Sequence, residues 1–204
     1  MSEQLSPDER ARERYQRDTD EHEMTVIRDD GVYRHLRFQK PGTWNYGYDL
    51  VTWPGYLAIT GDAGEYMFHR IQDMFEFFGG HGDRINAHYW SEKLCDPGRD
   101  MARVYSEDVL REHVEQWLED IDRADDAVLA AAVKRDVVAH AYSEHEAREA
   151  LANFRHDDGT TIDSWEWDLR EYDSRFLWCC WAILRGIARY QALVPAQALS
   201  AEAV

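Results

Sequence analysis

Residues 32–69 have the sequence VYRHLRFQKPGTWNYGYDLVTWPGYLAITGDAGEYMFH and carry the clearest strand pattern in the chain. Apolar and polar side chains alternate along it, which is typical of strands that bury one face. Pro54-Gly55 suits a type II turn, because proline presets φ and glycine allows a positive φ. Gly61-Asp62-Ala63-Gly64 is expected to form the next turn. Such short connections between successive strands indicate antiparallel pairing.

We therefore predict an antiparallel meander of four or five strands over residues 24–69. The strands are expected at 24–28, 32–39, 44–53, 56–60 and 65–69. The second strand has Val32, Leu36 and Phe38 on one face and Tyr33, His35, Arg37 and Gln39 on the other, with Arg34 as the exception. The third is expected to place four large side chains on one face: Trp44, Tyr46, Tyr48 and Leu50.

Beyond residue 70 the apolar spacing becomes that of helices. Helices are expected over 71–78, 86–94, 107–121, 125–140, 144–154 and 174–191. Ser106 and Asp173 are candidate N-caps, and Ser143 with Glu146 forms a candidate capping box. Residues 1–23 are charged, with Pro7 suited to a first helical position, and are expected to form a leader helix or a flexible arm. Residues 194–204 are expected to form a tail.

This order of elements predicts an α+β fold, in which an N-terminal antiparallel meander packs on C-terminal helices. Residues 24–204 are expected to form a single domain, with the sheet over 24–69 and the helical part over 70–193. The chain has 204 residues, 44% of them hydrophobic and 13% aromatic. This composition is sufficient for a buried core and excludes disorder of the whole chain.

Targeting signals and cysteines bear on the compartment. No apolar run reaches the roughly 18 residues that span a bilayer, and the first residues, MSEQLSPDERARERYQRD, lack the apolar core of a signal peptide. The three cysteines, Cys95, Cys179 and Cys180, cannot form an even set of disulfides. We therefore expect a reduced, cytoplasmic protein.

The formal net charge is −17, from 40 Asp and Glu against 23 Lys and Arg. This charge disfavours direct binding to a nucleic-acid backbone or an anionic membrane. Its distribution is uneven: the net charge is −4 over residues 1–23, zero over 24–70 and −13 over 71–204. The neutral stretch 24–70 could bind a small anion, and the acidic flanks leave mimicry of nucleic acid open.

Catalytic and metal-binding patterns are weak. His140 and His145 are five residues apart, which matches no common zinc spacing. The chain lacks a Gly-x-Ser-x-Gly nucleophile motif, and Gly79-Gly80-His81-Gly82 lacks the Lys-Ser/Thr of a phosphate-binding loop. No cofactor or metal is expected, and a non-enzymatic function is favoured.

Aromatic and cationic residues of the neutral stretch suggest a nucleotide site. Aromatic faces stack on bases, and Arg or Lys neutralises phosphate. Trp44, Tyr46 and Tyr48 are the candidate stacking residues. Arg34, Arg37 and Lys40 are the candidate phosphate ligands, and Trp53, Tyr56 and Asp62 the candidate rim. The alternative is that these aromatic side chains belong to the core, as they commonly do on a half-buried sheet.

The stretches 38–78, 85–94 and 165–190 resemble a family of small proteins encoded by tailed phages and prophages. The likeness rests on Lys40-Pro41-Gly42, Trp53-Pro54-Gly55, Thr60-Gly61-Asp62, Asp73-Met74-Phe75 and Phe176-Leu177-Trp178-Cys179. It implies an accessory phage protein that acts in the cytoplasm of the host cell.

In that setting we expect the protein to counter host defence by sequestering a nucleotide second messenger. One alternative is an acidic DNA mimic or another protein-binding inhibitor of a defence factor, and a second is a cryptic nucleotide hydrolase. The expected partner is thus a nucleotide or a host protein. A homodimer is compatible with the sequence.

Overall fold

The computed structural model describes residues 5–80, 82–96 and 98–201, with the backbone only for 194–201. Contacts divide the chain into two compact units, Met1–Ala102 with Tyr172–Val204 (unit 1) and Arg103–Glu171 (unit 2). The expected single domain over 24–204 stays a prediction. Residues 1–4 of the expected leader and 202–204 of the expected tail lie outside the described residues.

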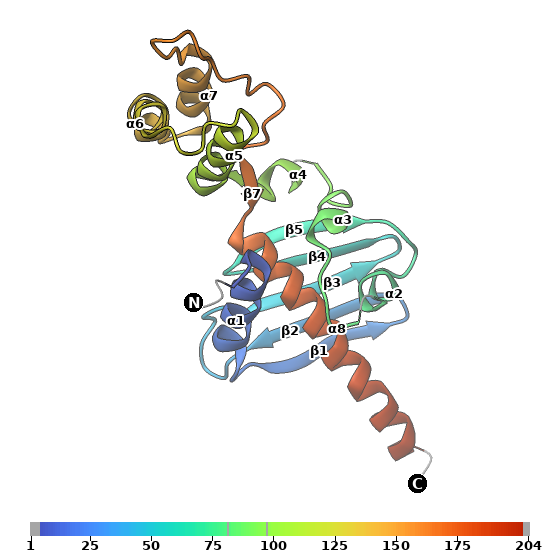
Figure 1. Ribbon diagram of the computed structural model, residues 1–204. Coiled ribbons are helices and arrows are strands. Elements are labelled where there is room, and N and C mark those ends of the chain that lie inside the picture. Colours follow the sequence, from blue (N-terminus) through green and yellow to red (C-terminus); the bar gives the residue numbers. More distant parts are fainter. Residues whose placement is uncertain (1–4, 81, 97, 202–204) are drawn as a thin grey trace. The chain divides into compact units, whose positions relative to one another are not determined.

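Unit 1 contains a five-stranded antiparallel sheet in the order β1-β2-β3-β4-β5, so the predicted α+β meander is confirmed. Helices α8, α1 and α2 lie on one face of this sheet (Figure 1). The elements of unit 1 are α1 (Pro7–Thr19), β1 (Glu23–Asp30), β2 (Tyr33–Gln39), β3 (Tyr48–Trp53), β4 (Tyr56–Gly61), β5 (Gly64–His69), α2 (Met74–Gly79), α3 (Ala87–Ser91), α4 (Gly98–Met101) and α8 (Ser174–Ala201).

Several element boundaries differ from the prediction: for example, α2 begins at Met74 and not at residue 71, and α6 (Ala127–Asp136) ends at Asp136 and not at residue 140. Strand β3 begins at Tyr48 and not at residue 44, because residues 44–47 form a turn in which Tyr46 has a φ of +54°. Period-two spacing of aromatic residues cannot distinguish such a turn from a strand. Helix α8 continues to Ala201, well past the expected end at Gln191.

The core of unit 1 lies between the sheet and α8. Leu36, Leu50 and Phe68 from the sheet and Cys180 and Ile183 from α8 are buried. Gly186 allows the helix to approach closely, since a Cβ atom there would lie 2.7 Å from Leu50 Cδ1. The buried α8 stripe confirms the helix expected from its apolar spacing.

Helix α1 is part of this core and not a free arm. Ser6 and Glu9 form a capping box at its start. Tyr15 packs edge-on against Trp178 of α8, with ring centroids 5.3 Å apart, and shares a 3.0 Å hydrogen bond with Tyr48. The inner side of α1 also carries two carboxylates: Asp18 accepts from Trp178 Nε1 at 3.3 Å and Asp8 from Trp181 Nε1 at 2.9 Å.

Unit 2 is a small helical unit with its own core. It contains β6 (Arg103–Tyr105), α5 (Glu107–Asp120), α6 (Ala127–Asp136), η1 (Val138–His140), α7 (Glu144–Asn153) and β7 (Arg170–Tyr172), whose last residue is assigned to unit 1. Ser106 caps α5 and Ser143 caps α7, as predicted. Its core includes Leu110, Leu129, Leu151 and Leu169.

Among the helices described, none combines the length and apolar character needed to cross a bilayer. All three cysteines are free thiols. Cys179 and Cys180 are buried in α8, and burial raises the pKa of both thiols. Cys95 is half-buried.

We expect a thiol reagent to modify Cys95 alone in the folded protein and all three cysteines after unfolding. Burial raises the pKa of all three thiols, so exposure distinguishes them: Cys179 and Cys180 are shielded from the reagent and Cys95 is not. A colorimetric thiol titration with and without denaturant measures both numbers. Fewer than three thiols in the denatured and unreduced protein would show a disulfide, and three fast thiols in the native protein would contradict the burial of α8.

Candidate functional site

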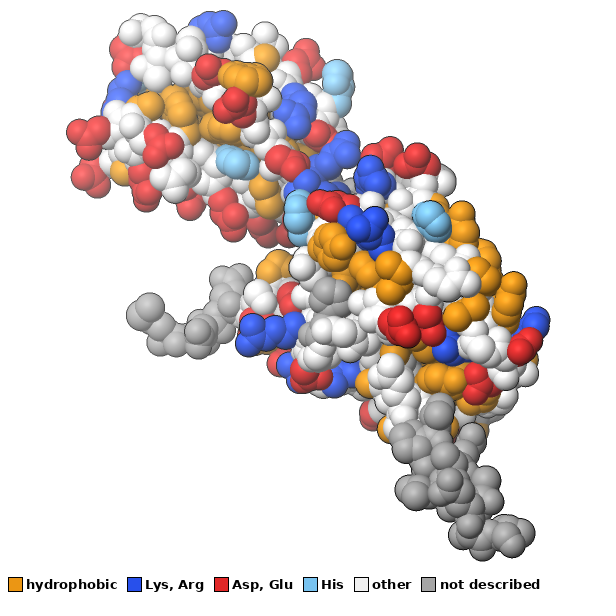
Figure 2. Space-filling model, turned by 90° about the vertical axis from the view of Figure 1, so that its right-hand side faces the viewer, with side chains coloured by type: hydrophobic (Ala, Val, Ile, Leu, Met, Phe, Trp, Pro, Cys, Tyr) orange, Lys and Arg blue, Asp and Glu red, His pale blue; other side chains and the backbone are white. Residues whose placement is uncertain are grey.

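The face of the sheet turned away from α8, called the open face below, carries polar and aromatic side chains. The strand register aligns it in three rows: Thr25, Arg37, Asp49, Thr60 and Glu65; Arg28, His35, Val51, Ala58 and Met67; and Trp53, Tyr56 and His69. Tyr33 precedes His35 by two residues on β2, and the Arg28 guanidinium lies 5.2 Å from its ring centroid. Most of these side chains are half-buried or exposed. Figure 2 shows hydrophobic side chains gathered on the surface of unit 1.

Asp49 organises one end of the open face. Its carboxylate accepts hydrogen bonds of 2.9 and 2.8 Å from Arg37 Nε and Nη2 and one of 3.0 Å from His35 Nε2. Burial raises the pKa of Asp49, but the bonds from Arg37 and His35 together outweigh it and hold the pKa below its ordinary value. Asp49 is therefore a fixed anion that orients both partners.

Trp44 lies beside this cluster. The Arg37 guanidinium sits over the Trp44 ring, 5.2 Å from its centroid, and the ring is 39% exposed. The ring also packs against Gly47, where a Cβ atom would lie 2.7 Å from Trp44 Cδ2. Arg37 and Trp44 thus present a cation and an aromatic surface together at the end of the open face.

The turn that carries Trp44 is held from two sides. Tyr46 N donates to Asp62 Oδ2 at 3.0 Å, and Asp62 N donates to Gly47 O at 3.1 Å. On the other side His22 Nε2 lies 3.1 Å from Tyr46 O. These bonds hold Tyr46 in its left-handed conformation and fix the position of Trp44.

His22 is 6% exposed, and its Nδ1 atom has no hydrogen-bond partner among the described residues. Burial lowers the pKa of His22 from its ordinary value of 6.5, and the bond to Tyr46 O opposes this only partly. Nearby Arg189 lowers the pKa further, whereas Asp20 raises it. The folded protein therefore favours neutral His22.

We expect this histidine to lower the free energy of unfolding as the pH falls below about 6.5. The unfolded chain takes up a proton near pH 6.5 that the folded chain resists, so the contribution is present above that pH and lost below it. Urea unfolding at several pH values between about 5 and 8 gives the free energy of unfolding at each pH. This free energy should change less with pH for His22→Gln than for the wild type. The exposed His145→Gln control should keep the wild-type dependence on pH, and an equal dependence for all three proteins would contradict the prediction.

An aromatic row occupies the other end of the open face. Trp53 and Tyr56 are stacked at 5.3 Å with an interplanar angle of 15°, and His69 lies 4.4 Å from the Tyr56 ring. The type II turn at Pro54-Gly55, with φ of +85° at Gly55, brings Trp53 and Tyr56 together. At about 3.3 Å per residue, Asp49 and Trp53 lie about 13 Å apart along β3.

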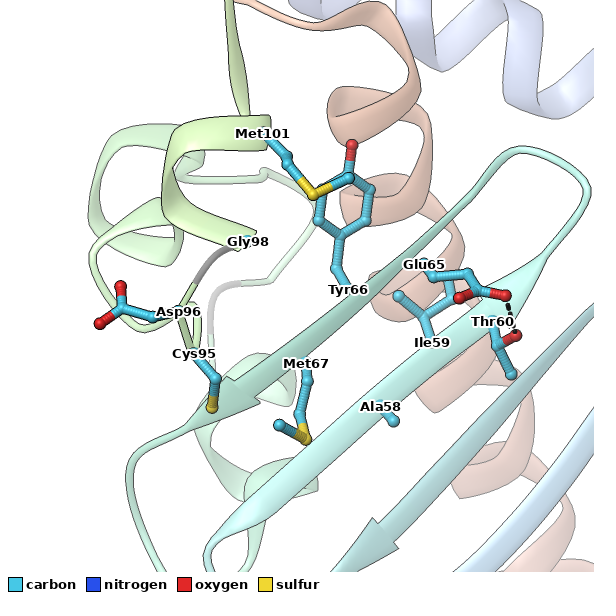
Figure 3. A pocket seen from close by; sticks show the side chains of 10 residues that line it. All are labelled: Ala58, Ile59, Thr60, Glu65, Tyr66, Met67, Cys95, Asp96, Gly98 and Met101. Atoms are coloured by element: carbon cyan, nitrogen blue, oxygen red, sulfur yellow. Dashed lines mark hydrogen bonds between the residues drawn. The ribbon is translucent and has the colours of Figure 1, made fainter.

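A pocket of about 300 Å³ adjoins the open face at β4 and β5 (Figure 3). Ala58 and Met67 line its apolar part, and Cys95 N donates to Met67 O at 2.8 Å. Glu65 and Asp96 add two carboxylates to its lining. Those charges disfavour a phosphate group here and leave the apolar part suited to an uncharged ring.

The structure brings four of the nine predicted site residues to the open face: Arg37, Trp44, Trp53 and Tyr56. The others have different positions. Arg34 lies on the helix-covered face and forms an ion pair with Asp73. Tyr48 is 1% exposed and stacks on Phe38 at 4.6 Å. Arg34 and Tyr48 therefore do not contribute to a ligand site on the open face.

The remaining three predicted residues have structural partners. Lys40 forms an exposed ion pair with Glu21 at 2.6 Å, and Asp62 holds the Trp44 turn. The Tyr46 ring lies 6.4 Å from Trp178. Within the described chain, no group of three or more His, Cys, Asp or Glu side chains is placed to hold a metal ion.

The prediction missed His35, Asp49 and His69 as members of the site. The alternation of β2 does place His35 beside Arg37 on the face opposite Leu36 and Phe38. Asp49 could have been found from the sequence, because it is the only charged residue of its strand and a carboxylate in a half-buried strand requires a cationic partner.

Comparison of the chain with protein-family models, with curated proteins and with solved structures finds no match in any of the three. The resemblance to a phage protein family stays a prediction. The same holds for the host-cell cytoplasm that it implies.

Proposed function

We propose that the open face of the sheet binds a small anionic nucleotide. The observation that carries the proposal is the pairing of Arg37 with the half-exposed Trp44 at one end of the open face, with the aromatic row Trp53–Tyr56–His69 at the other end. An aromatic ring stacks on a base, and a guanidinium binds phosphate through its N–H groups. Arg37 donates through Nε and Nη2 to Asp49, so Nη1 is the group that we assign to phosphate. These side chains lie in the stretch 24–70, whose net charge is zero in a chain of −17.

The spacing of the two ends supports a ligand with two rings. Arg37, which is opposite Asp49, lies about 13 Å from the level of Trp53 and Tyr56 along the strand direction. A cyclic dinucleotide, a cyclic trinucleotide or an ADP-ribose derivative has rings and phosphates to engage both ends. A polynucleotide is disfavoured, because the surrounding charge repels a long phosphate backbone.

In the biological setting we propose, the protein sequesters a nucleotide second messenger of host defence and does not convert it. The support for that setting is the resemblance of residues 38–78 and 165–190 to phage proteins. The support for binding is the open face. The two parts are separable, since the open face can bind a nucleotide whatever the origin of the gene.

A screen of these nucleotides by thermal unfolding tests the binding. A ligand at a hundred times its dissociation constant stabilises the protein by about 2.7 kcal/mol. We expect at least one phosphorylated ligand to do so and the matching nucleoside without phosphate to be weaker. If none of these nucleotides shifts the midpoint, the proposal is wrong.

One observation favours hydrolysis as a second candidate. Asp49 accepts from His35 Nε2, which leaves Nδ1 as the acceptor nitrogen of the ring. A histidine oriented by a carboxylate can take a proton from an attacking water. Incubation of the bound nucleotide followed by chromatography separates the two functions: intact ligand supports sequestration, and a product that His35→Gln abolishes supports hydrolysis.

A further inference from the structure

Unit 2 displays a tryptophan that its own core does not use. Trp165 is 77% exposed, more than any other large hydrophobic residue described. It occupies a tight turn in which Trp167 N donates to Ser164 O at 3.1 Å. It has no hydrogen bond or ring contact with the described residues.

The turn itself is firmly held. The Trp167 ring stacks on His113 of α5 at 5.1 Å with an interplanar angle of 12°, and Arg148 of α7 donates to Trp167 O at 3.3 Å. His113 Nε2 also lies 3.2 Å from Asp168 O. The neighbouring residues therefore fix the backbone while the Trp165 ring faces solvent.

The surroundings of Trp165 are acidic. Asp163 and Glu166 are exposed on either side of it, and neither forms an ion pair with the described residues. Unit 2 holds 19 Asp and Glu against 8 Lys and Arg, a formal net charge of −11. Figure 2 shows acidic side chains over much of the unit's visible surface.

This charge discriminates between possible partners of an exposed indole. Nucleic acid and anionic membranes repel a unit of −11, and a second copy of the unit carries the same charge. A protein surface with Lys and Arg around an apolar pocket attracts it. Tryptophan is also the residue most often found as the energetic centre of protein interfaces.

We propose that Trp165, with Asp163 and Glu166, forms a docking site for a basic protein surface that holds an apolar pocket. The indole fills the pocket, and the two carboxylates face the basic rim. This site is independent of nucleotide binding on the open face, because it uses side chains of unit 2 alone.

A labelled amphipathic helical peptide of lysine and leucine serves as the probe, because it combines positive charge with an apolar surface. We expect the protein to bind it at low salt and more weakly as salt rises. Trp165→Ala should weaken binding about tenfold or more, whereas Trp165→Phe should retain part of the affinity. Val128→Ala removes another exposed hydrophobic residue of unit 2 (71% exposed) and should change the affinity less than about twofold.

Two further measurements complete the test. Asp163→Asn with Glu166→Gln should flatten the salt dependence, and all variants should unfold at the wild-type temperature because the altered side chains are exposed. Equal affinity of wild type and Trp165→Ala would overturn the proposal. Absence of peptide binding at low salt, or equally tight binding of polylysine of the same length, would overturn it as well.

Discussion

Replacing Arg34 by methionine is expected to lower the free energy of unfolding by roughly 3 kcal/mol. Arg34 donates two hydrogen bonds of 2.9 Å to Asp73, and the two side chains are only 13% and 17% exposed. The guanidinium also rests on the rings of Phe75 and Tyr190, at 4.7 and 5.7 Å. Methionine keeps the apolar contacts and leaves the Asp73 carboxylate buried without its cation.

Urea unfolding of Arg34→Met, Asp73→Asn and the double variant measures the pair. We expect the double variant to lose clearly less than the sum of the single variants, because the second change removes the unpaired charge. Nucleotide affinity should be unchanged, since the pair lies on the helix-covered face. A loss below about 0.5 kcal/mol for Arg34→Met would show that the pair adds little to stability.

The same pair implies a dependence on acid. Burial raises the pKa of Asp73, but the bonds from Arg34 and Phe75 N outweigh it, so the folded pKa lies below the ordinary 3.8. Stability from this group is thus complete above that pH and is lost as the pH falls further. Wild type should lose stability in this range more steeply than Arg34→Met.

Replacing Arg37 by alanine is expected to weaken nucleotide binding more than any other single change on the open face. The change removes the guanidinium that we assign to phosphate, which is also the cation stacked over the Trp44 ring. We expect at least a tenfold loss of affinity and a flatter dependence on salt, because one ionic contact is gone. Isothermal titration at several salt concentrations measures both.

Arg135→Ala is the matched control for Arg37→Ala. Arg135 lies on α6 of unit 2, its side chain is 73% exposed, and it pairs with Asp136 at 2.6 Å, so its loss changes the net charge equally. We expect less than about a twofold change in affinity for this variant. If both variants bind equally weakly, general charge and not the Arg37 site attracts the ligand.

The fold was predictable because its patterns are local. Alternation in 32–39 and 56–69, with the turns at Pro54-Gly55 and Gly61–Gly64, determines the meander. Ser106 and Ser143 indicate two helix starts, because a serine hydroxyl can accept a hydrogen bond from a backbone N–H of the first turn. The division into two units was not predictable in the same way, because it depends on which helices share a core and not on spacing along the chain.

The candidate site was only partly predictable. Arg37 could be placed on the open face, because its neighbours Leu36 and Phe38 identify the buried face and side chains alternate along a strand. Trp44 and Tyr46 fit a strand pattern as well as a turn, and only the bonds from His22 and Asp62 determine the turn. The partner of Arg34 is Asp73, 39 residues away, and such a contact depends on tertiary packing.

The affinity of Trp44→Ala for a nucleotide that binds the wild type tests the central claim most directly. Trp44 is 39% exposed in a turn, so the variant should remain folded, and far-UV circular dichroism with thermal unfolding verifies this. Loss of a stacked base contact should cost about 1–3 kcal/mol, which is a loss of affinity of about five- to 150-fold, while Trp165→Ala binds as the wild type does. A folded Trp44→Ala protein with unchanged affinity would contradict the account and remove the open face as the nucleotide site.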